Sequence, residues 1–119
     1  SCIGLLSAGV LNLNNMRDHK NDEESDKKTL VVFMGYKAAK TYHLFLTVPP
    51  ILMLGTYIGL LQPSYLGISL SIPLLIVVLA IARVYRTKDE KKLDPELKKL
   101  ALTTFLSSIL FTTSLCVSF

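Results

Sequence analysis

Four oxygen-bearing side chains recur at a fixed spacing near the start of the chain. Asn14, Asp18, Asp22 and Asp26 lie four residues apart, which on an α-helix places side chains along one slowly turning stripe. Carboxylates this close repel one another unless a cation lies among them. Hard divalent ions such as Mg²⁺ prefer oxygen ligands, usually one or two carboxylates together with phosphate oxygens. One interpretation of this stretch is therefore a site at which a metal ion and a diphosphate meet.

Basic side chains flank this stripe. Arg17, Lys27 and Lys28 lie close in sequence to Asp18 and Asp22, and Arg and Lys bind phosphate oxygens through charge-assisted hydrogen bonds. A simpler interpretation is also open, because an acidic run at the end of a hydrophobic helix is often a solvated cap and a motif match is only a hypothesis. The spacing alone says nothing about the substrate.

The charged residues are confined to two blocks. All 13 Lys and Arg and all 9 Asp and Glu lie within residues 17–40 and 83–99, and the net charge is +4. The rest of the 119 residues, at 1–16, 41–82 and 100–119, carry no charge. Uncharged regions separated by charged blocks are typical of a multi-pass membrane protein. Because the bases alternate with acids beside apolar segments, we expect no nucleic-acid partner.

The uncharged regions predict an all-α, multi-pass transmembrane helix bundle. Residues 1–16 are too few, at about 1.5 Å per residue, to cross a hydrocarbon core of about 30 Å, so we interpret them as the end of a span. The long uncharged region holds two spans divided by a Gln-Pro-Ser turn, and the last span follows an Asp-Pro-Glu helix start. The predicted spans are residues 36–61, 65–85 and 95–117.

An aspartate-rich loop, residues 17–35, precedes these three spans. In its last part, Thr29–Met34 is β-branched and aromatic, so we expect an extended run at the membrane surface that ends at Gly35. Both charged blocks must lie on one side of the membrane, because two spans separate them. Since positively charged loops stay in the cytoplasm, the aspartate-rich loop is expected there.

Two other features leave alternatives open. The basic residues of the second block, residues 83–99, could hold a phosphate, but we favour a solvated cytoplasmic loop. Small residues four apart, at Gly4 with Ala8 and at Gly55 with Gly59, predict close approach between helices. The Gly55–Gly59 pair could instead drive dimerisation, but we favour packing against a neighbouring helix of the bundle.

The first charged block resembles a known motif. The pattern N-N-M-R-D-x-x-x-D-x-x-x-x-K-x-T-L-V-V-x-x-G, from Asn14 to Gly35, is similar to the second aspartate-rich motif of the UbiA-type intramembrane prenyltransferases. It most resembles the branch that prenylates 1,4-dihydroxy-2-naphthoate in menaquinone biosynthesis.

Two positions depart from the family pattern. Asp26 stands where Gly is usual before the Lys, which affects a tight turn or adds a carboxylate, and Phe33 stands where Arg is usual, which removes a cation.

The resemblance implies a fold, an activity and partners. It implies the C-terminal portion of a nine-helix bundle in the bacterial inner membrane, with Mg²⁺ and a polyprenyl diphosphate held at two aspartate-rich motifs. It implies transfer of the polyprenyl group to 1,4-dihydroxy-2-naphthoate, giving demethylmenaquinone with loss of CO₂ and diphosphate. The first motif is not in this chain. We therefore expect an inactive part of the enzyme, whose N-terminal half supplies the rest of the metal site.

The resemblance also implies residue roles. Asp18 and Asp22 correspond to the catalytic carboxylates that bind the metal, and Lys27 to a catalytic lysine beside the diphosphate. Asn14 and Arg17 correspond to substrate-binding positions at the polar mouth. Two alternatives stay open: a UbiA-type enzyme with another aromatic acceptor, and a non-catalytic multi-pass carrier or scaffold whose acidic block is only solvated.

Overall fold

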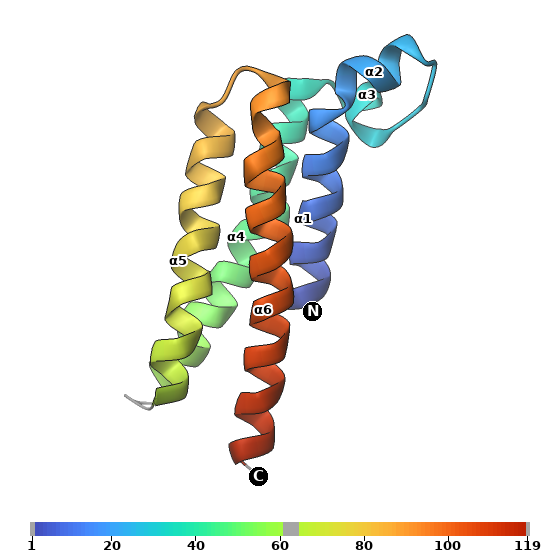
Figure 1. Ribbon diagram of the computed structural model, residues 1–119. Helices are drawn as coiled ribbons and strands as arrows, with labels where there is room; N and C mark the ends of the chain where they lie inside the picture. The colour runs from blue at the N-terminus through green and yellow to red at the C-terminus, as the bar shows by residue number, and fades with distance from the viewer. Residues whose placement is uncertain (1, 61–64, 119) are drawn as a thin grey trace.

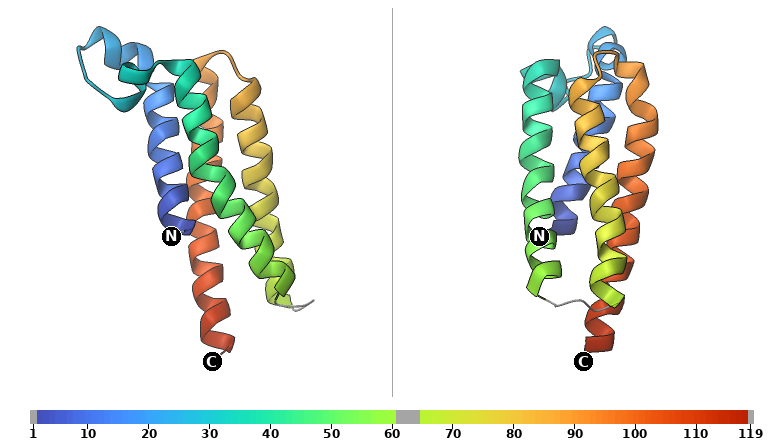
Figure 2. Two further views of the ribbon diagram at one scale, coloured as in Figure 1. Left: turned by 180° about the vertical axis from the view of Figure 1, so that it is seen from behind. Right: turned by 90° about the vertical axis from the view of Figure 1, so that its left-hand side faces the viewer.

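Helices make up all the regular structure in the part of the chain that the computed structural model describes, residues 2–60 and 65–118. Four long helices run along a body of 51 × 24 × 20 Å, and shorter helical segments lie at one end of it (Figure 1, Figure 2). The all-α prediction is confirmed. The elements are α1 (Cys2–Arg17), α2 (His19–Glu24), α3 (Leu30–Met34), α4 (Tyr36–Leu60), α5 (Tyr65–Arg86), the 3₁₀ helix η1 (Glu90–Leu93) and α6 (Asp94–Ser118).

The long helices form a ring in which each packs on two neighbours. Both α1 and α5 contact α4 on one side and α6 on the other. Helices α4, α5 and α6 match the three predicted spans to within one residue at each end. Among the described helices, Tyr36–Leu60 and Gly67–Arg86 are long and apolar enough to cross a membrane. That α6 also crosses it stays a prediction.

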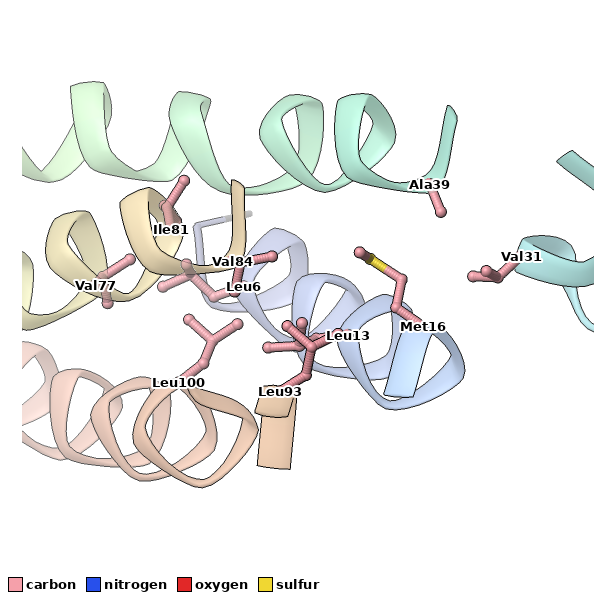
Figure 3. Close-up of a cluster of buried hydrophobic side chains, with 10 residues drawn as sticks. All are labelled: Leu6, Leu13, Met16, Val31, Ala39, Val77, Ile81, Val84, Leu93 and Leu100. Atoms are coloured by element: carbon pink, nitrogen blue, oxygen red, sulfur yellow. The ribbon is translucent and has the colours of Figure 1, made fainter. Parts of the chain in front are cut away.

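A cluster of buried hydrophobic side chains forms the core between the helices (Figure 3). Val31 of α3 and Leu93 of η1 are fully buried in it, so an apolar side chain holds each of these short helices against the bundle. The four long helices supply the other members of the cluster: Leu6, Leu13, Met16, Ala39, Val77, Ile81, Val84 and Leu100.

Large apolar side chains also cover the outside of the bundle. Phe45, Leu52, Ile68, Leu102 and Phe105 are each more than 60% exposed. Apolar surface of this extent is unfavourable in water and marks contact with a membrane or with another protein surface. The outward faces of the helices therefore suit an environment of lipid and neighbouring helices.

Both charged blocks lie at the same end of the bundle, which we call the charged end (Figure 1). Lys40 of α4 links them, because its Nζ donates to the carbonyl oxygens of Tyr85, at 3.3 Å, and of Thr87, at the C-terminal end of α5. The two blocks thus lie at one end of the bundle, and their position on one side of a membrane stays a prediction.

The prediction of an extended run at Thr29–Met34 is wrong. Thr29 is the N-cap of α3, since its Oγ1 accepts a hydrogen bond from the amide of Val32 at 3.3 Å. Gly35 ends the helix with φ +84°, a conformation that glycine adopts readily. Two capping residues and the burial of Val31 outweigh the weak strand preference of β-branched side chains.

Candidate functional site

Arg17, the last residue of α1, is the centre of an ion-pair cluster at the charged end. Its Nε and Nη2 donate to the two carboxylate oxygens of Asp18, at 2.9 and 3.0 Å. Nη2 also donates to Oδ1 of Asn14 at 3.0 Å, and Nη1 donates to Oδ1 of Asp94 at 2.9 Å. The structure thus brings together three of the predicted site residues and adds a fourth, from α6.

The charges in this cluster keep one another ionised. Hydrogen bonds from Arg17 lower the pKa of Asp18, and the charge of Lys27 contributes in the same direction. The hydrogen bond to Asp18 raises the pKa of Arg17 above its ordinary value. The pKa of Asp94 is lowered by its hydrogen bonds with Lys98 and then Arg17. Asp18 is therefore a carboxylate at neutral pH, which is the form that binds cations.

The predicted stripe continues across the junction of α1 and α2. The amide of Asp18 donates to the carbonyl oxygen of Asn14 at 3.1 Å, and the amide of Asp22 to that of Asp18 at 2.8 Å. These three residues occupy successive turns on one face, as the spacing predicts. Asp26 does not, because α2 ends at Glu24 and Asp26 has φ +53°. The prediction that all four residues share the stripe is wrong at this position.

A Schellman turn ends α2 and brings Lys27 back over Asp22. The amide of Asp26 donates to the carbonyl oxygen of Glu23 at 3.2 Å, and the amide of Lys27 to that of Asp22 at 2.8 Å. This is the paired hydrogen bonding of a helix that ends with one left-handed residue. As a result, Nζ of Lys27 lies 3.1 Å from Oδ1 of Asp22.

Among the described residues, no protein group satisfies one carboxylate oxygen of Asp22. The residue is 6% exposed, and its buried Oδ2 has no hydrogen-bond partner among the described residues. A buried oxygen of this kind is costly unless it is satisfied, and a bound cation would satisfy it. The donor set of Asp18 and Asp22 therefore fits an oxygen-liganded ion such as Mg²⁺. Within residues 2–60 and 65–118, however, no three His, Cys, Asp or Glu side chains are grouped to hold a metal ion.

A polar pocket of about 250 Å³ adjoins the cluster. Its walls come from both charged blocks, with Arg17, Asp18, Lys20 and Asn21 on one side and Asp89, Glu90 and Lys91 on the other. The interpretation of the second block as a merely solvated loop is thus wrong in part. Leu93 is fully buried and Glu96 is 6% exposed, because this segment packs against the end of α1 and the start of α6.

Two positions of the first block stay outside the cluster. Lys28 is exposed, and Phe33, which departs from the family pattern, is 90% exposed on the surface of α3. An apolar ring therefore projects at the charged end where the family pattern has a cation.

Comparison with known proteins identifies the family. The model of the UbiA prenyltransferase family matches residues 1–109. The chain belongs to this family. Membership confirms the resemblance found at Asn14–Gly35 and shows that the helices form a multi-pass membrane bundle. No solved structure matches the chain.

Two relatives in the family carry the same name. The chain is 30% identical over 115 residues to the 1,4-dihydroxy-2-naphthoate octaprenyltransferase of Escherichia coli strain K12, a match that covers 97% of the chain. It is 32% identical over 117 residues to the protein of that name from Haemophilus influenzae, with 96% covered. The chain spans 37% of the length of each relative.

Proposed function

We propose that this chain is part of a membrane prenyltransferase that transfers a polyprenyl group from polyprenyl diphosphate to 1,4-dihydroxy-2-naphthoate. The observation that carries the proposal is the position of Asp18 and Asp22 on successive turns at the charged end of an apolar bundle. Each carboxylate lies beside a base, Arg17 or Lys27. Family membership supports the type of reaction, and the names of the two relatives support the acceptor.

Asp18 and Asp22 would hold Mg²⁺ together with ligands from the rest of the protein. Asp22 offers the unsatisfied Oδ2, and Asp18 offers oxygens that it shares with Arg17. When bound, the ion supplies positive charge that stabilises the departing diphosphate. Lys27 and Arg17 would bind diphosphate oxygens directly, and Asn14 would keep Arg17 directed at the mouth of the bundle.

The proposed reaction balances without an added oxidant. The ring carbon that bears the carboxylate forms a bond to C1 of the prenyl chain, while the C1–oxygen bond breaks and its electron pair leaves with diphosphate. The carboxylate then departs as CO₂, and its bonding electrons restore the aromatic ring. The direct product is the prenylated naphthoquinol, which is the reduced form of demethylmenaquinone. The apolar bundle suits a long isoprenoid chain, and the charged end would face the cytoplasm of a bacterial cell.

The test uses the full-length protein in detergent. It is incubated with polyprenyl diphosphate, Mg²⁺ and equal amounts of 1,4-dihydroxy-2-naphthoate and a hydroxybenzoate, and the products are identified by mass spectrometry. We expect prenylated naphthoquinol that has lost the mass of CO₂. Prenylation of the benzoate alone would assign another acceptor, and the absence of any prenylated product would refute the enzymatic function in favour of a carrier or scaffold.

A further inference from the structure

We infer that Asp94 is a positioning residue of this site: from the start of α6 it holds the guanidinium of Arg17 and thereby directs the carboxylate of Asp18. The inference rests on the proposed function, because it concerns the same diphosphate site. Arg17 and Asp94 are 77 positions apart, yet Nη1 and Oδ1 are 2.9 Å apart. The contact therefore joins the aspartate-rich block to the last helix.

The shape of the guanidinium makes this contact directional. An Arg side chain presents five N–H donors in one rigid plane. Asp18 takes the edge formed by Nε and Nη2, and Asp94 takes Nη1. Because acceptors on two edges fix the orientation of the plane, the direction of the Asp18 carboxylate follows from the position of Asp94.

Asp94 is the firmer of the two anchors. It follows Leu93, which is fully buried in the core, and it opens α6, which packs along α1. Lys98 holds its second oxygen, with Nζ at 3.0 Å from Oδ2. Asp18, by contrast, lies between α1 and the short α2, which projects beyond the long helices (Figure 1). The packing of the bundle thus fixes the position of Asp94, and Asp94 in turn orients the guanidinium group of Arg17.

The alternating charges around Arg17 indicate what the Arg17–Asp94 ion pair, which we call the tether, contributes. Asp18, Arg17, Asp94 and Lys98 alternate in sign along a continuous chain of contacts. Without Asp94, only Asp18 and Asn14 among the described side chains would hold the guanidinium of Arg17. With Asp94 present, Arg17 stays at the mouth of the bundle when Asp18 shares an oxygen with another cation.

The tether is expected to act on binding rather than on folding. The side chains of Arg17, Asp18 and Asp94 are 29%, 31% and 40% exposed, and ion pairs exposed to this extent contribute little to stability. Substitution of Asp94 should therefore change the affinity for the diphosphate while the thermal unfolding of the protein stays nearly the same.

The experiment measures Mg²⁺-dependent binding of inorganic pyrophosphate to the full-length protein by calorimetry. Asp94→Asn should weaken binding about tenfold, the size expected for loss of one charge-assisted contact. Asp94→Glu should recover most of the affinity. Lys98→Gln, which removes the other partner of Asp94, should weaken binding less than Asp94→Asn does, because the buried Leu93 and the start of α6 still hold Asp94 in place. In an Arg17→Gln background, Asp94→Asn should cause no further loss, because Asp94 acts through Arg17.

Three results would overturn the inference: unchanged affinity in Asp94→Asn, an equal loss in Lys98→Gln, or an additive loss in the Arg17→Gln background. The product assay with dihydroxynaphthoate tests the proposed reaction independently of the pyrophosphate affinities. A wild-type protein that binds pyrophosphate but forms no prenylated product would refute the proposed reaction and leave the positioning role to be judged by the affinities. A wild-type protein that binds no pyrophosphate would refute both.

Discussion

Lys27 is folded back onto Asp22, with Nζ 3.1 Å from Oδ1 and its backbone amide 2.8 Å from the carbonyl oxygen of the same residue. A single left-handed residue, Asp26, makes both contacts possible. The turn therefore pairs Asp22 with the ammonium group of Lys27, while Asp18 is paired with the guanidinium group of Arg17 at the end of α1.

Replacing Lys27 should weaken diphosphate binding. Lys27→Met keeps the length of the side chain and removes the ammonium group. We expect the KM for polyprenyl diphosphate to rise about tenfold in the full-length enzyme. Lys37→Met is the matched control, because Lys37 is an exposed base on α4 at the same end. Equal effects of the two variants would show that only the overall charge of this end matters.

Asp26 should limit the stability of the turn. Left-handed φ values disfavour residues with a Cβ, so Asp26→Gly should be stabilising, by about 0.5 kcal/mol or a degree or two in melting temperature. Asp26→Val should be destabilising, because a β-branched residue tolerates this conformation poorly. Thermal unfolding in detergent measures both changes. A lower melting temperature for Asp26→Gly would mean that the Asp side chain makes a contribution beyond the backbone turn.

Gly9 should mark the closest approach between α1 and α4. A Cβ at this position would lie 3.1 Å from Cγ2 of Thr47 and 3.8 Å from Cε1 of His43, and both of those residues are buried. Gly9→Leu should therefore overpack the interface and cost about 1–3 kcal/mol, seen as a lower melting temperature. Gly4→Leu is the control on the same helix, since a Cβ there meets nothing within 4 Å. Equal losses would contradict this account of the interface.

The ion cluster should depend on pH in the acid range. The folded state lowers the pKa of Asp18 and of Asp94 below the ordinary value of 3.8. Any stability that the pairs contribute is therefore present above pH 3.8 and is lost as the pH falls through the lowered values. The difference in melting temperature between wild type and Asp94→Asn, which is expected to be small, should be constant above about pH 5 and shrink toward pH 2. A difference that grows on acidification would contradict the lowered pKa values of Asp18 and Asp94.

Local spacing and membrane topology were sufficient to predict much of this arrangement. The four-residue period places Asn14, Asp18 and Asp22 on one face because helical hydrogen bonds bridge the α1–α2 junction. Because two spans separate the charged blocks, both blocks are predicted to lie at the same end of the bundle, and Figure 1 shows them there. Each of these inferences depends only on the regular geometry of helices.

The remaining features depend on contacts between distant residues or on details of caps. The role of Asp94 depends on Arg17, 77 positions away, and its position before Pro95 predicts only a helix start. Thr29 and Gly35 make α3 a helix although its residues favour strands. Gly55 and Gly59 match a packing motif, but a Cβ at either meets nothing within 4 Å among the described residues, whereas Gly9, which the predicted pairs did not include, lies at a close contact.

The most direct test of the central claim is the rate of prenyl transfer by the full-length enzyme after Asp18→Asn and Asp22→Asn are combined, measured at saturating Mg²⁺ and again with the ion chelated. Asn keeps the size of each side chain and removes the negative charge that would hold the ion. The account predicts that the double variant inserts and elutes like the wild type but transfers at least about a hundredfold more slowly, and that chelation stops the wild type. Transfer at the wild-type rate by the double variant, or undiminished transfer without divalent ions, would contradict it.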